Sequence, residues 1–183
     1  YAINSVGTSY GADIQFTTIA PAQVTTLPVS NITSTTALSG GNVTYDGGSN
    51  VTSKGLCWSM TENPTIYDSK TTDGTGFGQY SSNLSGLASG TTYHVRAYAI
   101  NSVGTSYGAD IQFTTASQAK VTTLPASTVT STTAVSGGNV TSDGGSTVTS
   151  KGLCWSMTEN PTISDLKTTD GTGIGSYISN LSG

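Results

Sequence analysis

The chain repeats itself with an offset of 97 residues. Residues 1–18 reappear unchanged at 98–115, and the match then continues without a gap to the last residue. Of the 86 aligned pairs, 71 are identical and 15 differ. This period is too long for a solenoid repeat and matches one small domain of about 100 residues. We therefore expect tandem domains, and function is sought first in the array that they form.

The repeat divides the chain into one complete unit and two partial ones. Residues 1–18 correspond to the C-terminal strands of a preceding repeat, residues 19–115 to a complete repeat, and residues 116–183 to the N-terminal part of the next. Two explanations of the partial ends stay open: a continuous polymer of repeats, or strand exchange between chains into a head-to-tail filament. We favour the polymer, because residues 87–97 would have no counterpart where two chains meet.

Composition narrows the function classes. The net charge is −4 and only six Lys and Arg are present, so we expect neither nucleic acid nor an anionic membrane surface as a partner. No apolar run approaches the roughly 20 residues that span a bilayer. Cys57 and Cys154 occupy the same position of two repeats, so no disulfide within a repeat is expected. Composition of this kind suits a bacterial surface better than a disulfide-stapled secreted module.

The pattern of side chains predicts an all-β fold. Branched and aromatic residues alternate with Thr and Ser, while Gly and Pro interrupt each stretch long enough for a helix. Pro28 indicates an edge strand, and Asp46 and Asp73 precede turn glycines. We predict that residues 73–76 form a hairpin turn. The seven expected strands are residues 24–28, 35–44, 51–60, 65–72, 77–84 and 93–99, and a last one with Ile111 and Phe113. This number is typical of an immunoglobulin-like sandwich.

The C-terminal part of the complete repeat has a sequence pattern that resembles a known domain family. The pattern LxxGTxYxVRAxAxN, followed by a Gly-rich loop and a last strand, resembles the end of a fibronectin type III domain. With GLCWSxTxNPT and TTDGTG, the repeat is similar to the fibronectin type III-like repeats of large surface proteins of Bacteroidota. The resemblance implies a tyrosine corner at Tyr93, whose hydroxyl bonds to upstream backbone. Where the family usually has its core Trp, this chain has Gly40 and Gly41, and its Trp58 lies one strand later.

No residue pattern predicts catalysis, a cofactor or a metal site. We expect Cys57 and Cys154 to be half-buried small residues, and the single histidine, His94, to face solvent. A nucleophile with a base and an orienting group is not recognisable. Calcium at the domain junctions stays an alternative, although residues 19–24 and 116–121 contain no acid. Six Asn-x-Ser/Thr triplets, which chance explains in such a chain, begin at Asn31, Asn42, Asn50, Asn83, Asn139 and Asn180.

The loop between the last two strands is the best candidate for partner contact. Tyr98 and Tyr107 are predicted to be exposed there, and Asn101 and Ser102 lie between them. Aromatic side chains beside Asn and Ser are typical of adaptable binding loops. Packing against a neighbouring domain is the alternative role of these aromatics.

Two functions follow from these expectations. The first is a non-catalytic structural spacer in an extended bacterial surface adhesin, stalk or filament, located outside the cell and contacting its neighbouring repeats. The second is a module that binds glycan or a surface protein through the loop of residues 101–108. That loop is identical in residues 4–11, which suits either a multivalent binder or a recent duplication.

Overall fold

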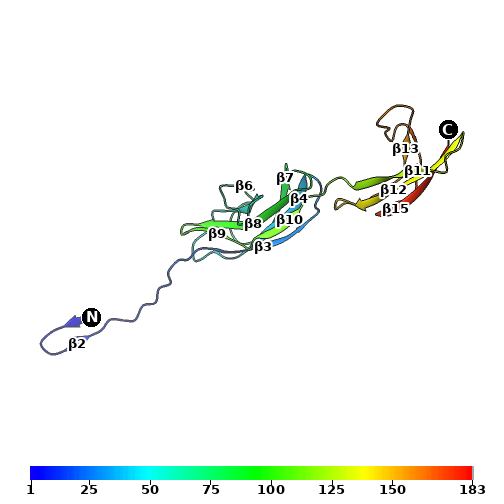
Figure 1. Cartoon of the computed structure of the whole chain (residues 1–183). Coiled ribbons are helices and arrows are strands. Elements are labelled where there is room, and N and C mark those ends of the chain that lie inside the picture. Colours follow the sequence, from blue (N-terminus) through cyan, green and yellow to red (C-terminus); the bar gives the residue numbers. More distant parts are fainter. Residues whose placement is uncertain (183) are drawn as a thin grey trace.

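The computed structural model describes residues 1–182, all of whose regular elements are β-strands. The all-β, immunoglobulin-like fold class is thereby confirmed. The three parts of the chain follow one another in an elongated arrangement: an N-terminal hairpin, a complete sandwich and an open C-terminal unit (Figure 1). Among the described residues, no helix has the length and apolar character needed to cross a membrane.

The complete unit contains two antiparallel sheets. One has the order β3-β4-β7, and the other has the order β10-β8-β5-β6 with β9 also paired to β8. The strands are β3 (Gln23–Ser30), β4 (Thr36–Tyr45), β5 (Ser53–Ser59), β6 (Ser69–Lys70), β7 (Gly78–Ser85), β8 (Thr92–Asn101), β9 (Gly104–Tyr107) and β10 (Ile111–Thr114). Their inner faces enclose one core, whose most buried members include Val43, Leu56, Leu84, Val95 and Ala97.

Several local predictions are confirmed. β3 is an edge strand, and its register against β4 shifts between Leu27 and Ser30, the stretch that contains Pro28. A proline cannot donate to the ladder, so an edge with a bulge accommodates it. The tyrosine corner is also present: the Ala88 N–H donates to the Tyr93 hydroxyl at 3.0 Å.

Two strand predictions are wrong. Residues 65–72 and 77–84 do not form a hairpin with each other, because β6 pairs with β5 while β7 pairs with β4 in the opposite sheet. The backbone of residues 73–74 exchanges hydrogen bonds with Lys54 of β5, so the chain crosses from one sheet to the other here. The predicted loop of residues 101–108 is also shorter than expected, because Gly104–Tyr107 forms β9.

Tyr80 explains why the second strand has glycines where the resembling family has its tryptophan. Its hydroxyl donates to the Gly55 carbonyl at 2.7 Å across the core. A Cβ at Gly41 would collide with the Tyr80 hydroxyl and ring carbon and with the Ala97 side chain, and one at Gly40 with the Tyr80 carbonyl. The core is therefore centred on Tyr80 of β7, which leaves no space for a Cβ atom at Gly40 or Gly41 of β4.

The C-terminal unit repeats only part of this sandwich. β11 (Lys120–Ser127), β12 (Thr133–Ser142) and β15 (Gly175–Ser182) form one three-stranded sheet. The opposite layer contains only β13 (Cys154–Trp155) paired with β14 (Leu166–Lys167). No described residues take the place that β8, β9 and β10 occupy in the complete unit. Figure 1 shows this unit at the C-terminal end of the chain.

The N-terminal segment is a small hairpin that stands apart from both units (Figure 1). β1 (Ala2–Ile3) pairs with β2 (Thr8–Ser9), and residues 1–18 are exposed throughout. This segment has the same sequence as residues 98–115, which the complete unit folds into the end of β8, β9 and β10. One sequence is therefore seen once inside a sandwich and once outside it.

Candidate functional site

Tyr98 is not the exposed contact residue that we predicted. Only 2% of it is exposed, because the segment that follows β6 covers the outer face of β8. Its hydroxyl donates to the Thr71 carbonyl at 2.7 Å, and its ring lies against Gly55. The alternation of β8 correctly places Tyr98 opposite the core face, but a second layer of chain buries that face as well.

Asn101 is also buried and holds three segments together. Its Nδ2 donates to the carbonyls of Ala20 and Asp46, both at 2.7 Å. Its Oδ1 accepts the N–H groups of Val103 and Gly104, which closes the β8–β9 turn. The Asn101 amide therefore makes its hydrogen bonds within the sandwich.

Ser102 and Tyr107 remain partly accessible. The exposed Ser102 hydroxyl lies 2.7 Å from that of Ser49. Tyr107 is half-buried; its hydroxyl accepts the Ile66 N–H at 3.1 Å, and the Arg96 guanidinium lies 4.7 Å from its ring centroid. The four predicted contact residues thus lie close together, but most of their polar side-chain atoms form hydrogen bonds within the sandwich.

Cys57 is fully buried on β5, contrary to our prediction that it is half-buried, because the Pro64 and Arg96 backbone covers it. Its Sγ lies 3.3 Å from the Pro64 carbonyl and 3.5 Å from the Arg96 carbonyl. Burial raises the pKa of the Cys57 thiol from its ordinary 9.0 to about 11. A thiol in this state is a poor nucleophile at neutral pH. Its counterpart Cys154 is half-buried, as expected for both cysteines.

His94 does not face solvent freely, contrary to our prediction. His94 is half-buried, and its Nδ1 lies 3.0 Å from Oδ2 of Asp110. Asp110 is the residue that precedes β10. The same carboxylate oxygen accepts the Asn63 N–H at 2.8 Å. The pair therefore ties the start of β10 to β8 and to the turn at Asn63.

The acidic residues serve local structure. Asp46 accepts the Gly48 N–H at 2.8 Å, which confirms its turn role. Asp73 does more than predicted, because it accepts hydroxyl hydrogen bonds from Thr71 and from Ser82 of the opposite sheet. Within residues 1–182, no group of three or more His, Cys, Asp or Glu is arranged to hold a metal ion.

Sequence reasoning missed Lys54. This lysine is buried on β5, where its ammonium donates to the carbonyls of Gly76, Phe77 and Gly78 at 2.9–3.5 Å and lies 5.3 Å from the Tyr80 ring centroid. The sequence contains the signal: Lys54 alternates with Leu56 and Trp58, so it falls on the core face of its strand. Its role is to anchor the crossover between the two sheets.

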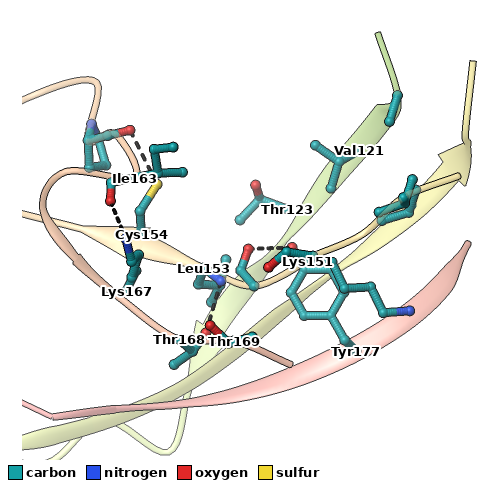
Figure 2. Close-up of a pocket in the computed structure, with 16 residues that line it drawn as sticks. Val121, Thr123, Lys151, Leu153, Cys154, Ile163, Lys167, Thr168, Thr169 and Tyr177 are labelled. Carbon is teal, nitrogen blue, oxygen red and sulfur yellow. Dashed lines mark hydrogen bonds between the residues drawn. The ribbon is translucent and has the colours of Figure 1, made fainter. Parts of the chain in front are cut away.

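A groove of about 700 Å³ lies in the C-terminal unit. Figure 2 shows Val121 and Thr123 of β11 beside the groove, with Lys151, Leu153 and Tyr177 across it. Its lining residues are Ala119, Val121, Thr123, Val140, Val148, Ser150, Lys151, Gly152, Leu153, Cys154, Pro161, Ile163, Lys167, Thr168, Thr169 and Tyr177. We name this surface the C-terminal groove.

In the complete unit, the space that corresponds to this groove is filled. Val24 of β3 is 9% exposed, whereas its counterpart Val121 is 58% exposed. Leu56 is fully buried, whereas Leu153 is half-buried. The filling elements are β8 and the β8–β9 hairpin, since β8 pairs with β5 from Ser53 to Ser59. The C-terminal groove therefore corresponds to the space that these strands fill in the complete unit.

At the junction between the two units, Ala116 and Ser117 form backbone hydrogen bonds. The Ala116 N–H donates to the Thr33 carbonyl at 3.0 Å, and its carbonyl accepts the Gly90 N–H at 3.1 Å, both in the complete unit. The next residue, Ser117, donates its N–H to the Gly144 carbonyl of the C-terminal unit at 2.7 Å. Consecutive residues are thus bound to different units.

No protein-family model matches the chain, and no curated protein matches it. Among solved structures, it is similar to the sensor domain of the anti-sigma factor RsgI4 in Pseudobacteroides cellulosolvens. The identity is 19%, the TM-score is 0.39, and the match covers 54% of this chain and 97% of that one.

Proposed function

We propose that this chain is a non-catalytic structural spacer in an extended bacterial surface fibre, stalk or adhesin. Near-identical sandwiches would be repeated along the fibre, each contacting the next through the same short junction. We further propose that the repeats are relatives of the fibronectin type III-like repeats of Bacteroidota surface proteins. The strand order, the tyrosine corner and the motifs of the complete repeat support that relationship. Such a fibre would lie outside the cell.

The junction at Ala116 carries the proposal. Ala116 is 8% exposed, and besides its backbone bonds its carbonyl accepts the Ser89 hydroxyl at 2.8 Å. A Cβ at Gly90 would lie 3.1 Å from the Ser117 Cβ, so the two units approach closely at this point. A joint with this many contacts restricts rotation between the units, and a spacer needs such stiffness to keep its ends apart.

The N-terminal side of the complete unit offers the other half of the same joint. The Ala20 N–H donates to the Gly47 carbonyl at 2.7 Å, as Ser117 does to Gly144. Ile19, the counterpart of Ala116, is 55% exposed, and no described residues stand for 87–91 of a preceding unit there. The repeat therefore encodes both halves of one joint, which is what a linear array requires.

Nuclear magnetic resonance relaxation of the intact chain tests this function. We expect the amides of the two units to report one common rotational diffusion tensor, because the joint makes them one rigid body. Inserting Gly-Ser-Gly between Ala116 and Ser117 should separate the two tensors. The same insertion between Gly11 and Ala12, in the exposed N-terminal segment, is the matched control and should change nothing in either unit.

Two outcomes would count against the spacer function. Independent tumbling of the units in the unmodified chain would show that the joint is not stiff. Specific binding of the intact chain on a glycan array would instead favour the binding-module function, with the exposed Ser102 and half-buried Tyr107 as the first residues to substitute.

A further inference from the structure

We propose that the outer edge of β7 pairs with β7 of a second copy of this chain. The two strands would run antiparallel about a two-fold axis, so the contact is isologous. It would join two molecules side by side through one continuous sheet. This lateral contact lies away from the joint and goes beyond the spacer function, although its use in bundling fibres rests on that function.

The outer edge of β7 has free backbone hydrogen-bonding groups. β7 and β3 are the two edge strands of the sheet β3-β4-β7 (Figure 1). Within residues 1–182, the backbone–backbone hydrogen bonds of residues 79–85 go only to β4. An edge strand in this state is a template on which a further strand can pair.

The other edges of the complete unit are protected against such pairing. β3 contains Pro28, and its register against β4 shifts between Leu27 and Ser30. β6 has only two residues, and β9 and β10 have four each. Short strands, prolines and bulges are the devices by which proteins blunt a sheet edge. β7 has none of them, because its eight residues pair one to one with β4 without a register shift.

The side chains of β7 favour a second copy as its partner. A two-fold axis brings each side chain close to residues of its own strand in the other copy, so a charged edge would repel itself. β7 contains no charged residue. Its exposed side chains are Gln79, Ser81, Asn83 and Ser85, and each carries both a donor and an acceptor. Self-pairing therefore opposes no like charges and lets these side chains hydrogen-bond to one another.

The backbone of β7 selects one register. Two antiparallel copies keep their buried and exposed faces aligned only when the axis passes through a residue rather than between two. An axis at Ser82 places Ser81 of one copy opposite Asn83 of the other. An axis at Ser81 would instead pair Leu84 with Gly78, whose φ of 92° is far from extended backbone. We therefore place the axis at Ser82.

The same edge recurs in the next repeat. β15 pairs one to one with β12, and it also contains neither a charged residue nor a proline. An array would therefore present one such edge in each repeat. A single pair of edges is a weak contact, but several pairs between two fibres reinforce one another where the geometry allows them to form together. The edges would then hold fibres together laterally.

Sedimentation of the intact chain over a range of concentrations tests the contact. The weight-average mass should rise above the 18.5 kDa of one chain as concentration increases. Ser81→Lys combined with its counterpart Ile178→Lys should abolish this rise, because charges on an edge strand oppose pairing. The matched control, Thr25→Lys with Thr122→Lys, places the same charges at exposed positions of β3 and β11 and should leave association unchanged. Circular dichroism spectra of both variants should match that of the intact chain, which excludes unfolding as the cause.

Cross-linking then tests the register. A chain with Ser81→Cys and a second chain with Asn83→Cys, both in a Cys154→Ser background, should form a mixed disulfide in a glutathione buffer. Disulfides that join two copies of the same variant should form at least about tenfold more slowly. The reason is that diagonal neighbours in a sheet lie about 7–8 Å apart, which is beyond the reach of a disulfide.

Either of two results would overturn the proposal. One is a chain that stays monomeric at all concentrations, or whose association survives the lysines on β7 and β15. The other is a mixed disulfide that forms no faster than the two symmetric disulfides. The relaxation experiment on the joint can be run with the lysine variant, so failure of this inference is separable from failure of the spacer function.

Discussion

At the residue scale, the sandwich depends on side chains that cross between its two sheets. Tyr80 reaches from β7 to the Gly55 carbonyl, Asp73 binds Ser82, and Lys54 holds the carbonyls of residues 76–78. Each of these groups is at least partly buried and has partners, which is the condition under which buried polar groups do not destabilise a fold. The same contacts recur at Tyr177, Asp170 and Lys151 in the C-terminal unit.

Replacing Gly41 by Ala should destabilise the complete unit by about 1–3 kcal/mol, because the added methyl group has no space beside Tyr80 and Ala97. Chemical denaturation followed by Trp58 fluorescence in a Trp155→Phe background measures this change. Thr36→Ala, at an exposed position on the same strand, is the control and should stay within about 0.5 kcal/mol. Equal stability of the two variants would contradict the tight packing around Tyr80.

Stability should fall as the pH rises from about 9 to about 11. Burial raises the pKa of the Cys57 thiol from 9.0 to about 11, so in this window the unfolded chain releases a proton that the folded chain keeps. The cost approaches roughly 2 kcal/mol at the upper end of the window. Burial also raises the pKa of Tyr80, which adds to the loss above pH 10.

Urea unfolding of the intact chain and of Cys57→Ser between pH 8 and pH 11 isolates the thiol contribution. The difference in unfolding free energy between the two proteins should be constant below pH 9 and should shift in favour of the variant above it. A constant difference throughout the range would mean that the thiol titrates normally in the fold.

At the scale of elements, identical strands behave differently according to their neighbours. β5 is continuous from Ser53 to Ser59 because it lies between β6 and β8. Its counterpart β13 is reduced to Cys154–Trp155, since no strand pairs with its other edge among the described residues. A strand is thus defined by its hydrogen-bonding partners as much as by its sequence.

Hydrogen exchange should reveal this difference between the two units. We expect the amides of Ser53–Ser59 to exchange slowly and those of residues 150–156 to exchange much faster, because exposed or unpaired edges open at low cost. The central strands β4 and β12 provide the internal control, since each has partners on both sides. Equal protection of the two regions would show that the C-terminal unit is closed in solution.

Prediction of the elements succeeded where the pattern is local and failed where it is not. The strands with alternating side chains, and the edge position of Pro28, follow from local sterics and hydrogen bonding. The predicted hairpin around residues 73–76 failed because a Gly-rich stretch between two strands is compatible with a turn or with a crossover between sheets. The prediction that Tyr98 is exposed failed because the chain after β6 covers the face of β8 on which Tyr98 lies.

At the scale of the whole molecule, the joint and the groove depend on contacts between parts that are distant in sequence. Ala116 contacts Thr33 and Gly90, which no local pattern connects. The groove corresponds to the surface that β8 and β9 cover in the complete unit. The spacer function proposed above rests on the contacts of this joint.

The sequence by itself determined the repeat, its period, the all-β class and most strand positions, because identity at a fixed offset and side-chain alternation are properties of the chain alone. Only the tertiary structure decided that Tyr98 and Asn101 are buried in the fold, that Lys54 is buried, and that Ala116 and Ser117 are hydrogen-bonded to different units. The reason is physical: burial and hydrogen-bond partners are set by which segments meet in space, and here those partners lie up to 83 residues apart.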